Sequence, residues 1–256
     1  LREVLKVVKE TVVPLTLLGN GSNVLVRDKG IRGIVIKLGN MLRHFYEAED
    51  LLVFGSGYSL ALASYKAMEC GKTGMEFAVG IPGSIGGAVY MNAGAYDGEM
   101  QNIVNCVKVM DLQGNERVLT AEELNFGYRK TSLQNSGLIV TEVTLKMPSG
   151  NKDEIKSKMD DFSHRRISKQ PLEMPSAGSM FKRPPGYFAG TLIDQAGLKG
   201  YTVGGAQIST KHAGFVVNVG GATAADVLQL IKDVQTKIKA GVGVELQPEV
   251  LVIGEE

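Results

Sequence analysis

The feature that most constrains this chain is a glycine-rich stretch at residues 80–94. The stretch contains five glycines beside hydroxyl and amide side chains, and residues 80–96 include no acidic or basic residue. Glycines let a backbone turn sharply and let its N–H groups approach a ligand closely, which suits a bound pyrophosphate. The stretch is therefore interpreted as a nucleotide cradle.

The composition narrows the classes of partner. Lysine and arginine number 28 against 27 aspartate and glutamate, and no basic run appears, so we predict no nucleic-acid partner. The two cysteines and three distant histidines lack metal-ligand spacing, which predicts no metal site. No apolar run approaches the roughly 20 residues that span a bilayer, and residues 1–8 suggest an amphipathic helix rather than a signal peptide. We expect a cytoplasmic protein with no membrane contact.

The hydrophobic pattern divides the chain at Pro148-Ser-Gly150. Before this point, short β-rich runs alternate with glycine turns around one helix at residues 59–70. The expected strands are residues 15–18, 24–26, 34–38, 51–54, 104–112, 116–119 and 138–146. After it, one helix is expected over residues 152–167 and another follows the cap residues Thr223 and Asp226. Both should pack on a sheet that includes residues 212–219 and 250–253, which predicts an α+β lobe.

A second glycine loop, Gly19-Asn-Gly-Ser-Asn23, directly follows an apolar strand. It begins like the dinucleotide fingerprint G-x-G-x-x-G, but Val24 takes the third glycine position and a strand follows instead of a helix. Neither glycine loop continues into the Gly-Lys-Ser/Thr of a P-loop. The loops at 19–23 and 80–88 could together grip a dinucleotide through backbone N–H groups and polar side chains. The alternative is two tight turns without a ligand.

Three polar residues stand in loops where a catalytic role competes with an ordinary one. Arg129 presents a planar fork that matches a carboxylate, although an arginine in a polar loop is usually solvated. Ser179 follows a glycine but lacks a G-x-S-x-G elbow, so a turn-forming role is the simpler interpretation. Glu249 precedes an apolar strand, where an exposed edge carboxylate is the default.

Taken together, these segments resemble the UDP-N-acetylenolpyruvoylglucosamine reductase family, also called the MurB family. The resemblance covers essentially the whole chain, and residues 181–190 look like its type II branch. The motifs that support it are Leu18-Gly-Asn-Gly-Ser-Asn23, Glu76 to Ala95, Phe126-Gly-Tyr-Arg129, Ala177-Gly-Ser179, Gly204-Gly-Ala206 and Pro248-Glu-Val250. It implies an FAD-binding domain of the p-cresol methylhydroxylase type, made of two α+β subdomains, over residues 1–148. A C-terminal α+β substrate-binding lobe would follow over residues 149–256.

The resemblance also implies the reaction and its ligands. A noncovalent FAD and the co-substrate NADPH would reduce UDP-N-acetylglucosamine enolpyruvate to UDP-N-acetylmuramate, a step of peptidoglycan precursor synthesis, in a monomeric enzyme. Contacts with the substrate's diphosphate or uridine are implied for Lys169, Lys182 and Arg183. The implied cofactor-binding residues are Gly19, Asn20, Gly21, Ser22, Asn23, Gly80, Ile81, Pro82, Gly83, Ser84, Gly87, Asn92 and Gly94.

The implied catalytic residues are Arg129, Ser179 and Glu249. NADPH would reduce the flavin and leave before the enolpyruvyl group takes its place, which predicts ping-pong kinetics. Arg129 and Glu249 would stabilise an enolate-like intermediate, and Ser179 would protonate C2 of the enolpyruvyl group.

Two hypotheses from other classes stay open, a related FAD-dependent oxidase that uses molecular oxygen and a non-catalytic module that binds a flavin or a sugar nucleotide. Family members normally begin with a further segment that helps to close the FAD site, and this sequence opens after it. We therefore expect either a late start of the sequence or a reduced affinity for FAD. The flavin spectrum of the purified protein separates the hypotheses.

Overall fold

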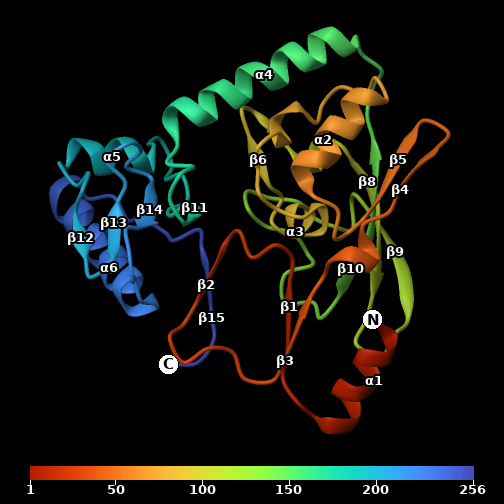
Figure 1. Ribbon diagram of the computed structural model, residues 1–256, viewed down its shortest axis with the longest axis horizontal. Helices are drawn as coiled ribbons and strands as arrows, with labels where there is room; N and C mark the ends of the chain where they lie inside the picture. The colour runs from red at the N-terminus through yellow and green to blue at the C-terminus, as the bar shows by residue number, and fades with distance from the viewer. The chain divides into compact units, whose positions relative to one another are not determined.

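The computed structural model describes the backbone throughout and the side chains of residues 1–39 and 41–256 (Figure 1). Contacts divide the chain into two compact units. The first unit comprises Leu1–Gly21 and Gly33–His164, and the second comprises Ser22–Arg32 and Arg165–Glu256. A short early segment, residues 22–32, thus belongs to the unit built mainly from the end of the chain. The functional domain boundary near residue 148 stays a prediction.

The first unit is built around a five-stranded antiparallel sheet in the order β4-β5-β10-β8-β9. Helices α2 and α3 cover one face of this sheet (Figure 1). Small residues such as Ala63, Ala67 and Ala88 are almost completely buried there, which lets the helices approach the strands closely. The elements are β4 (Phe45–Ala48), β5 (Leu51–Gly55), α2 (Leu60–Glu69), α3 (Ile85–Tyr90), β8 (Val104–Met110), β9 (Glu116–Thr120) and β10 (Ile139–Lys146).

The remaining elements of the first unit flank this sheet. Strands β1 and β3 pair in parallel, with Leu15 opposite Ile34. The amphipathic start of the chain is confirmed as a helix, α1, whose Leu5 packs on Met110 and Ile139. These elements are α1 (Arg2–Thr11), β1 (Leu15–Leu18), β3 (Ile34–Lys37), η1 (Asn40–Leu42), η2 (Glu76–Ala78), β6 (Gly94–Ala95), β7 (Gly98–Glu99) and η3 (Met100–Asn102).

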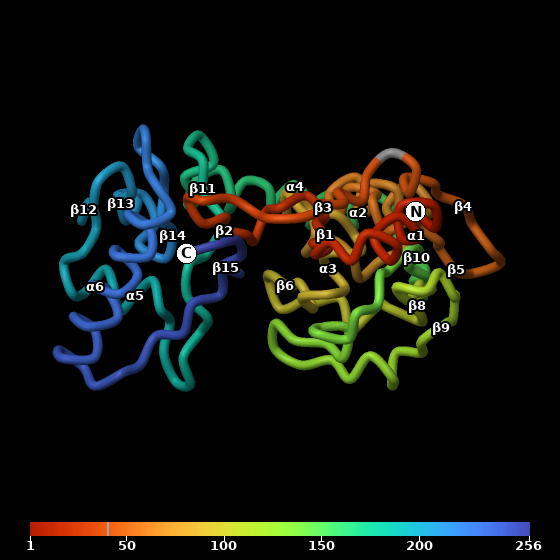
Figure 2. The backbone as a smooth tube through the Cα atoms, turned by 90° about the horizontal axis from the view of Figure 1, so that it is seen from below, coloured from red at the N-terminus to blue at the C-terminus, as the bar shows by residue number. Residues whose placement is uncertain are grey.

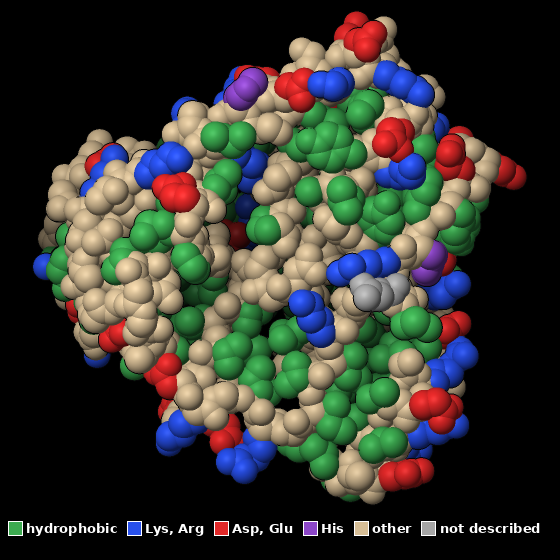
Figure 3. Space-filling view, viewed as in Figure 1, with side chains coloured by type: hydrophobic (Ala, Val, Ile, Leu, Met, Phe, Trp, Pro, Cys, Tyr) green, Lys and Arg blue, Asp and Glu red, His purple; other side chains and the backbone are tan. Residues whose placement is uncertain are grey.

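Helix α4 (Lys152–Lys169) confirms the predicted helix but corrects its expected packing. Ile155, Met159 and Phe162 form a buried cluster with Val79 of the first unit. The ring of Tyr96 stacks on Phe162 with the centroids 4.4 Å apart. The prediction that this helix covers the sheet of the later lobe is therefore wrong, because residues of the first unit fill its apolar face. Acidic and basic side chains intersperse along its outer side (Figure 3).

The second unit contains a four-stranded antiparallel sheet in the order β11-β14-β13-β12. Helix α6 contributes Leu230, Val234 and Ile238 to its core, at the spacing expected for one helix face. Among the described residues, no helix combines the length and the apolar character needed to cross a membrane. The elements are β11 (Ser176–Ser179), α5 (Ala189–Gln195), β12 (Thr202–Val203), β13 (Ala206–Ile208), β14 (Phe215–Asn218) and α6 (Ala224–Val242).

The last strand, β15 (Leu251–Ile253), confirms a predicted strand but not its neighbours. It pairs in parallel with β2 (Val24–Val26) and does not join the four-stranded sheet (Figure 2). The same early segment reaches α6, where the Asp28 carboxylate accepts the N–H groups of Ala224 and Ala225 at 2.6 and 2.9 Å. Residues 22–32 thus complete the second unit with a strand and a helix cap.

Candidate functional site

The two glycine loops of the first unit lie against each other, as the sequence predicts. Gly19 follows β1, and the Asn20 side chain donates to the Pro82 carbonyl at 3.3 Å. The Ser84 hydroxyl caps α3 by accepting the N–H of Gly87 at 3.3 Å. A Cβ on Gly19 would lie 2.5 Å from that hydroxyl oxygen, so a larger residue here would require the Ser84 side chain to shift. The loops therefore form one surface.

This surface suits a diphosphate. In the described part of the chain, the N–H groups of Gly19, Asn20 and Gly21 donate to no other backbone group. Asn20 and Gly21 are exposed, so an anionic oxygen can approach these donors. Ser84 is buried and its hydroxyl serves the cap, which gives it a structural role beside the predicted ligand role. Gly80, Ile81 and Gly83 lie in the same loop as Ser84, and their cofactor contacts stay predictions.

The Arg129 side chain is hydrogen-bonded to the end of this glycine-rich stretch. Its guanidinium donates from Nη1 to the Asn92 carbonyl at 3.3 Å and from Nη2 to the Gly94 carbonyl at 3.0 Å. The backbone of Arg129 has a φ of 55°, a left-handed conformation that is uncommon for a non-glycine residue. Gln134 holds the turn by donating to the Arg129 carbonyl at 3.1 Å. The guanidinium plane is thus fixed by its own partners.

Asn92 connects the glycine-rich stretch to the turn that bears Arg129. Its side chain is completely buried and donates to the Gly127 carbonyl at 3.0 Å and to Glu99 at 3.1 Å. Its amide oxygen accepts the N–H of Gln101 at 3.0 Å. The structure therefore gives this side chain internal partners, while its predicted cofactor contact and that of Gly94 remain untested.

Ser179 and Glu249 come from adjacent segments of the second unit. Ser179 ends β11 with an exposed side chain, and the Glu249 N–H donates to the carbonyl of the next residue, Met180, at 2.8 Å. The Lys182 N–H donates to the Gln247 carbonyl at 2.8 Å, so the two segments run antiparallel. Glu249 is half-buried. The structure brings these two predicted residues together, and Arg129 belongs to the other unit.

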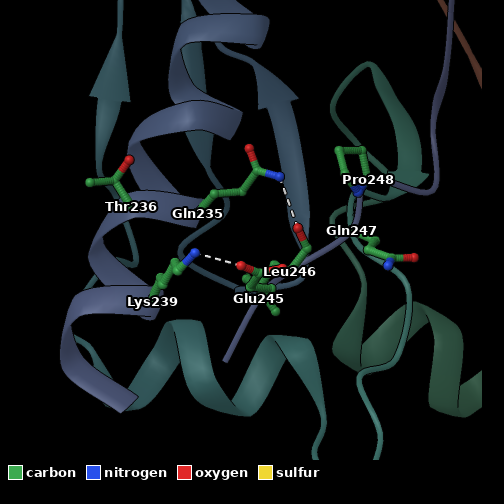
Figure 4. Close-up of a pocket in the computed structure, with 7 residues that line it drawn as sticks. All are labelled: Gln235, Thr236, Lys239, Glu245, Leu246, Gln247 and Pro248. Atoms are coloured by element: carbon green, nitrogen blue, oxygen red, sulfur yellow. Dashed lines mark hydrogen bonds and ion pairs between the residues drawn. The ribbon is translucent and has the colours of Figure 1, made fainter. Parts of the chain in front are cut away.

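Helix α6 anchors the segment that leads to Glu249. The Gln235 amide donates to the Leu246 carbonyl at 2.8 Å, and Lys239 forms an ion pair with Glu245 (Figure 4). These side chains line a hollow of about 330 Å³ together with Gln247 and others. Leu246 itself is buried in the core of the second unit. Helix α6 thus holds the segment that directly precedes Glu249.

The other predicted residues of the second unit lie in different settings. Asn23 donates from its side chain to the Glu249 carbonyl at 3.1 Å, which links a predicted cofactor residue to a predicted catalytic one. The Arg183 guanidinium stacks over Phe188 with a distance of 4.0 Å to the ring centroid. Lys169 is exposed at the end of α4, and Ser22 is half-buried. The ligand contacts of these residues and of Lys182 stay predictions.

Sequence reasoning passed over two residues that fix this arrangement. One is Gln134, which holds the turn that bears Arg129. The other is His212, whose isolated position in the sequence suggests no chemical role. His212 accepts the N–H of Gly214 at 3.0 Å, beside Ser179. The pattern His-x-Gly is a weak sequence signal, because the role of the histidine depends on a partner strand that the sequence does not identify.

Comparisons with known proteins cover nearly the whole chain. The family described as UDP-N-acetylenolpyruvoylglucosamine reductase, C-terminal domain, matches residues 170–253, and the FAD binding domain family matches residues 1–120. The UDP-N-acetylenolpyruvoylglucosamine reductase of Clostridium perfringens (strain SM101 / Type A) is 52% identical over 98% of this chain and 83% of that protein. The same-named protein of Geobacillus thermodenitrificans (strain NG80-2) is 50% identical over 99% of this chain and 83% of that protein.

A solved structure is similar over the same extent. The crystal structure of UDP-N-acetylenolpyruvylglucosamine reductase from Thermus caldophilus aligns with a TM-score of 0.84 and 41% sequence identity. The alignment covers 98% of this chain and 89% of that one.

Proposed function

Because the chain belongs to the UDP-N-acetylenolpyruvoylglucosamine reductase family, we propose that it reduces UDP-N-acetylglucosamine enolpyruvate to UDP-N-acetylmuramate with NADPH and FAD. The supporting observation is 52% identity over 98% of the chain. The predicted family and the predicted fold, an FAD-binding α+β domain followed by the reductase C-terminal domain, are confirmed. The chain is therefore an FAD-dependent oxidoreductase of peptidoglycan precursor synthesis, and no observation favours the oxidase or the non-catalytic module.

The glycine loops suit the diphosphate of FAD. The N–H groups of Gly19, Asn20 and Gly21 make no backbone bond within the described chain, and they would donate to phosphate oxygens. When bound, FAD supplies hydride transfer from NADPH to C3 of the enolpyruvyl group. The packing of Gly19 on Ser84 would keep the donors at a constant distance from the phosphates.

Arg129 would stabilise the negative charge that develops on the substrate carboxylate. A guanidinium matches a carboxylate in two-point geometry, which an ammonium does not. The carbonyls of Asn92 and Gly94 hold the guanidinium in place before substrate arrives. Stabilisation by such a fixed group needs little reorganisation during the reaction.

Ser179 and Glu249 would complete the reduction. Addition of a hydride at C3 leaves an electron pair at C2, and the Ser179 hydroxyl would supply the proton that forms the new C–H bond. Because the Ser179 side chain is exposed, solvent can return a proton to its oxygen. Glu249 would donate a hydrogen bond to the enolate-like carboxyl group. The uridine or diphosphate would contact Lys169, Lys182 and Arg183.

A two-step absorbance experiment tests this function. The purified, FAD-loaded protein should lose its flavin absorbance when NADPH is added without oxygen, and regain it when the enolpyruvyl sugar nucleotide follows. Ser179→Ala should leave the first step unchanged and slow the second by a factor of at least about 100. Ser176→Ala, three residues earlier on the same strand, removes a hydroxyl that bonds only to the backbone of Gly178, and it should slow the second step far less than Ser179→Ala. Absence of NADPH-dependent bleaching would reject the proposed function.

We also propose that the protein is a cytoplasmic monomer. Its two cysteines, Cys70 and Cys106, are both unpaired, which suits a reducing compartment. Sedimentation analysis should give the mass of a single chain.

A further inference from the structure

His212 holds a proton-free nitrogen against the backbone of the second unit. Its Nδ1 accepts the N–H of Gly214 at 3.0 Å. A ring nitrogen that accepts a hydrogen bond has no proton, so the ring is neutral with its hydrogen on Nε2. The half-buried imidazole lies edge to face with Phe215, with the centroids 5.0 Å apart.

Two glycines make room for this ring. A Cβ on Gly190, in the first turn of α5, would lie 3.3 Å from Cε1 of His212. A Cβ on Gly214 would lie 3.0 Å from the same atom and 3.6 Å from the Ser179 hydroxyl oxygen. The imidazole and the Ser179 hydroxyl therefore flank the same side of Gly214.

A series of main-chain hydrogen bonds continues from this contact. The Gly214 carbonyl accepts the N–H of Met180 at 2.8 Å, and the Met180 carbonyl accepts the N–H of Glu249 at 2.8 Å. Met180 is buried, and it directly follows Ser179. The bond to His212 thus holds the N–H of Gly214, and the carbonyl of the same residue, in the next peptide group, bonds to the N–H that follows Ser179.

We propose that His212 is a positioning residue, which holds Ser179 and Glu249 in register through the peptides of Gly214 and Met180. This inference rests on the function proposed above. In this role His212 acts through the backbone of Gly214. Its contribution is to keep the proton-donating hydroxyl and the carboxyl group at a constant separation, on which proton transfer depends strongly.

This arrangement makes the positions of Ser179 and Glu249 depend on pH. Protonation of Nδ1 would turn the acceptor into a donor that faces the Gly214 N–H and would break the bond. Burial lowers the pKa of His212 below its usual value of 6.5; a hydrogen bond with the backbone of His212 itself opposes this by raising the pKa, Lys199 and Lys169 lower it, and Asp194 raises it. Lys211 is the charged residue directly before His212 in the sequence. A lowered folded-state pKa means that the neutral form is favoured at neutral pH, and positioning is lost as the pH falls through this folded-state pKa, which lies below 6.5.

Two substitutions distinguish the effect of the His212 hydrogen bond from the effect of its side-chain volume. His212→Asn keeps an acceptor near the place of Nδ1 and cannot become charged, whereas His212→Leu keeps volume without an acceptor. We expect His212→Leu to slow reoxidation by the enolpyruvyl sugar nucleotide about 10- to 100-fold, with bleaching by NADPH unchanged. His212→Asn should retain both rates. The wild-type reoxidation rate should decrease on acidification below 6.5, and this decrease should be absent in His212→Asn.

Amide hydrogen exchange gives a readout independent of turnover. The amides of Gly214, Met180 and Glu249 should exchange faster in His212→Leu than in wild type or His212→Asn, while amides of the first unit stay unchanged. If His212→Leu does not fold, the pH dependence of wild type against His212→Asn still decides. An identical acid decrease in both would overturn the proposal, as would wild-type exchange and reoxidation in His212→Leu. Failure of NADPH bleaching in wild type would instead reject the proposed function, with the exchange result still valid.

Discussion

Replacement of Asn92 by alanine tests the arrangement that holds Arg129. The change removes an amide whose two donors reach Gly127 and Glu99 and whose oxygen accepts from Gln101, all at 3.0 to 3.1 Å. Asn92 is 0% exposed, so water cannot take the place of the lost amide without local rearrangement. The partners would be left unsatisfied in the interior.

The expected loss follows from these contacts. Each of the three hydrogen bonds contributes about 1 kcal/mol, and the bond to the Glu99 carboxylate contributes somewhat more. Asn92 also has a φ of 43°, and alanine tolerates this left-handed conformation less well by about 1 kcal/mol. The free energy of unfolding of the first unit should therefore decrease by about 3 to 5 kcal/mol.

Urea unfolding followed by circular dichroism measures this decrease. Asn125→Ala is the matched control, because Asn125 has the same φ of 43° with an exposed side chain. It should lose only the conformational part, about 1 kcal/mol. Equal losses in the two variants would refute the assignment of Asn92 as a buried connector. Asn92→Ala should also slow turnover, since Arg129 loses the fixed position of its carbonyl partner.

Three further changes test other contacts. Arg129→Lys should lower kcat/KM for the enolpyruvyl substrate by a factor of about 100 to 1,000, because lysine cannot reproduce the fork; steady-state kinetics checks this. Asp28→Ala should destabilise the second unit by about 1 kcal/mol through loss of the α6 cap, measured by amide exchange in α6. Hydrogen bonds from Thr223 and Gly205 lower the pKa of Asp226 below 3.8. Its stabilisation is present above 3.8 and lost below, so the Tm difference between wild type and Asp226→Asn should shrink on acidification.

Local signals were sufficient where one or two residues determine a conformation. The helix expected over residues 59–70 is confirmed as α2, and Thr223 with Asp226 forms the predicted capping box of α6. The glycine loops were also predictable, because the close approach of Gly19 to Ser84 favours a residue without a side chain. These features depend on neighbours along the chain or on the absence of a side chain.

Long-range partners could not be predicted in the same way. Periodicity identified the apolar face of α4 but not that Val79 and Tyr96 cover it. The apolar run of β15 indicated a strand, yet its partner β2 lies more than two hundred residues earlier. The left-handed backbone of Arg129 accompanies hydrogen bonds from its guanidinium to the distant carbonyls of Asn92 and Gly94, against the intrinsic preference of arginine.

The pairing of β2 with β15 has a consequence during synthesis. Asn23 and its partner Glu249 are 226 positions apart, so the early strand leaves the ribosome long before its neighbour exists. At about 5 to 20 residues per second, the delay is roughly 10 to 45 s. Throughout that interval the unpaired edge of β2 is available to other nascent chains or chaperones, and the second unit cannot complete this strand pair until residues 251–253 have emerged.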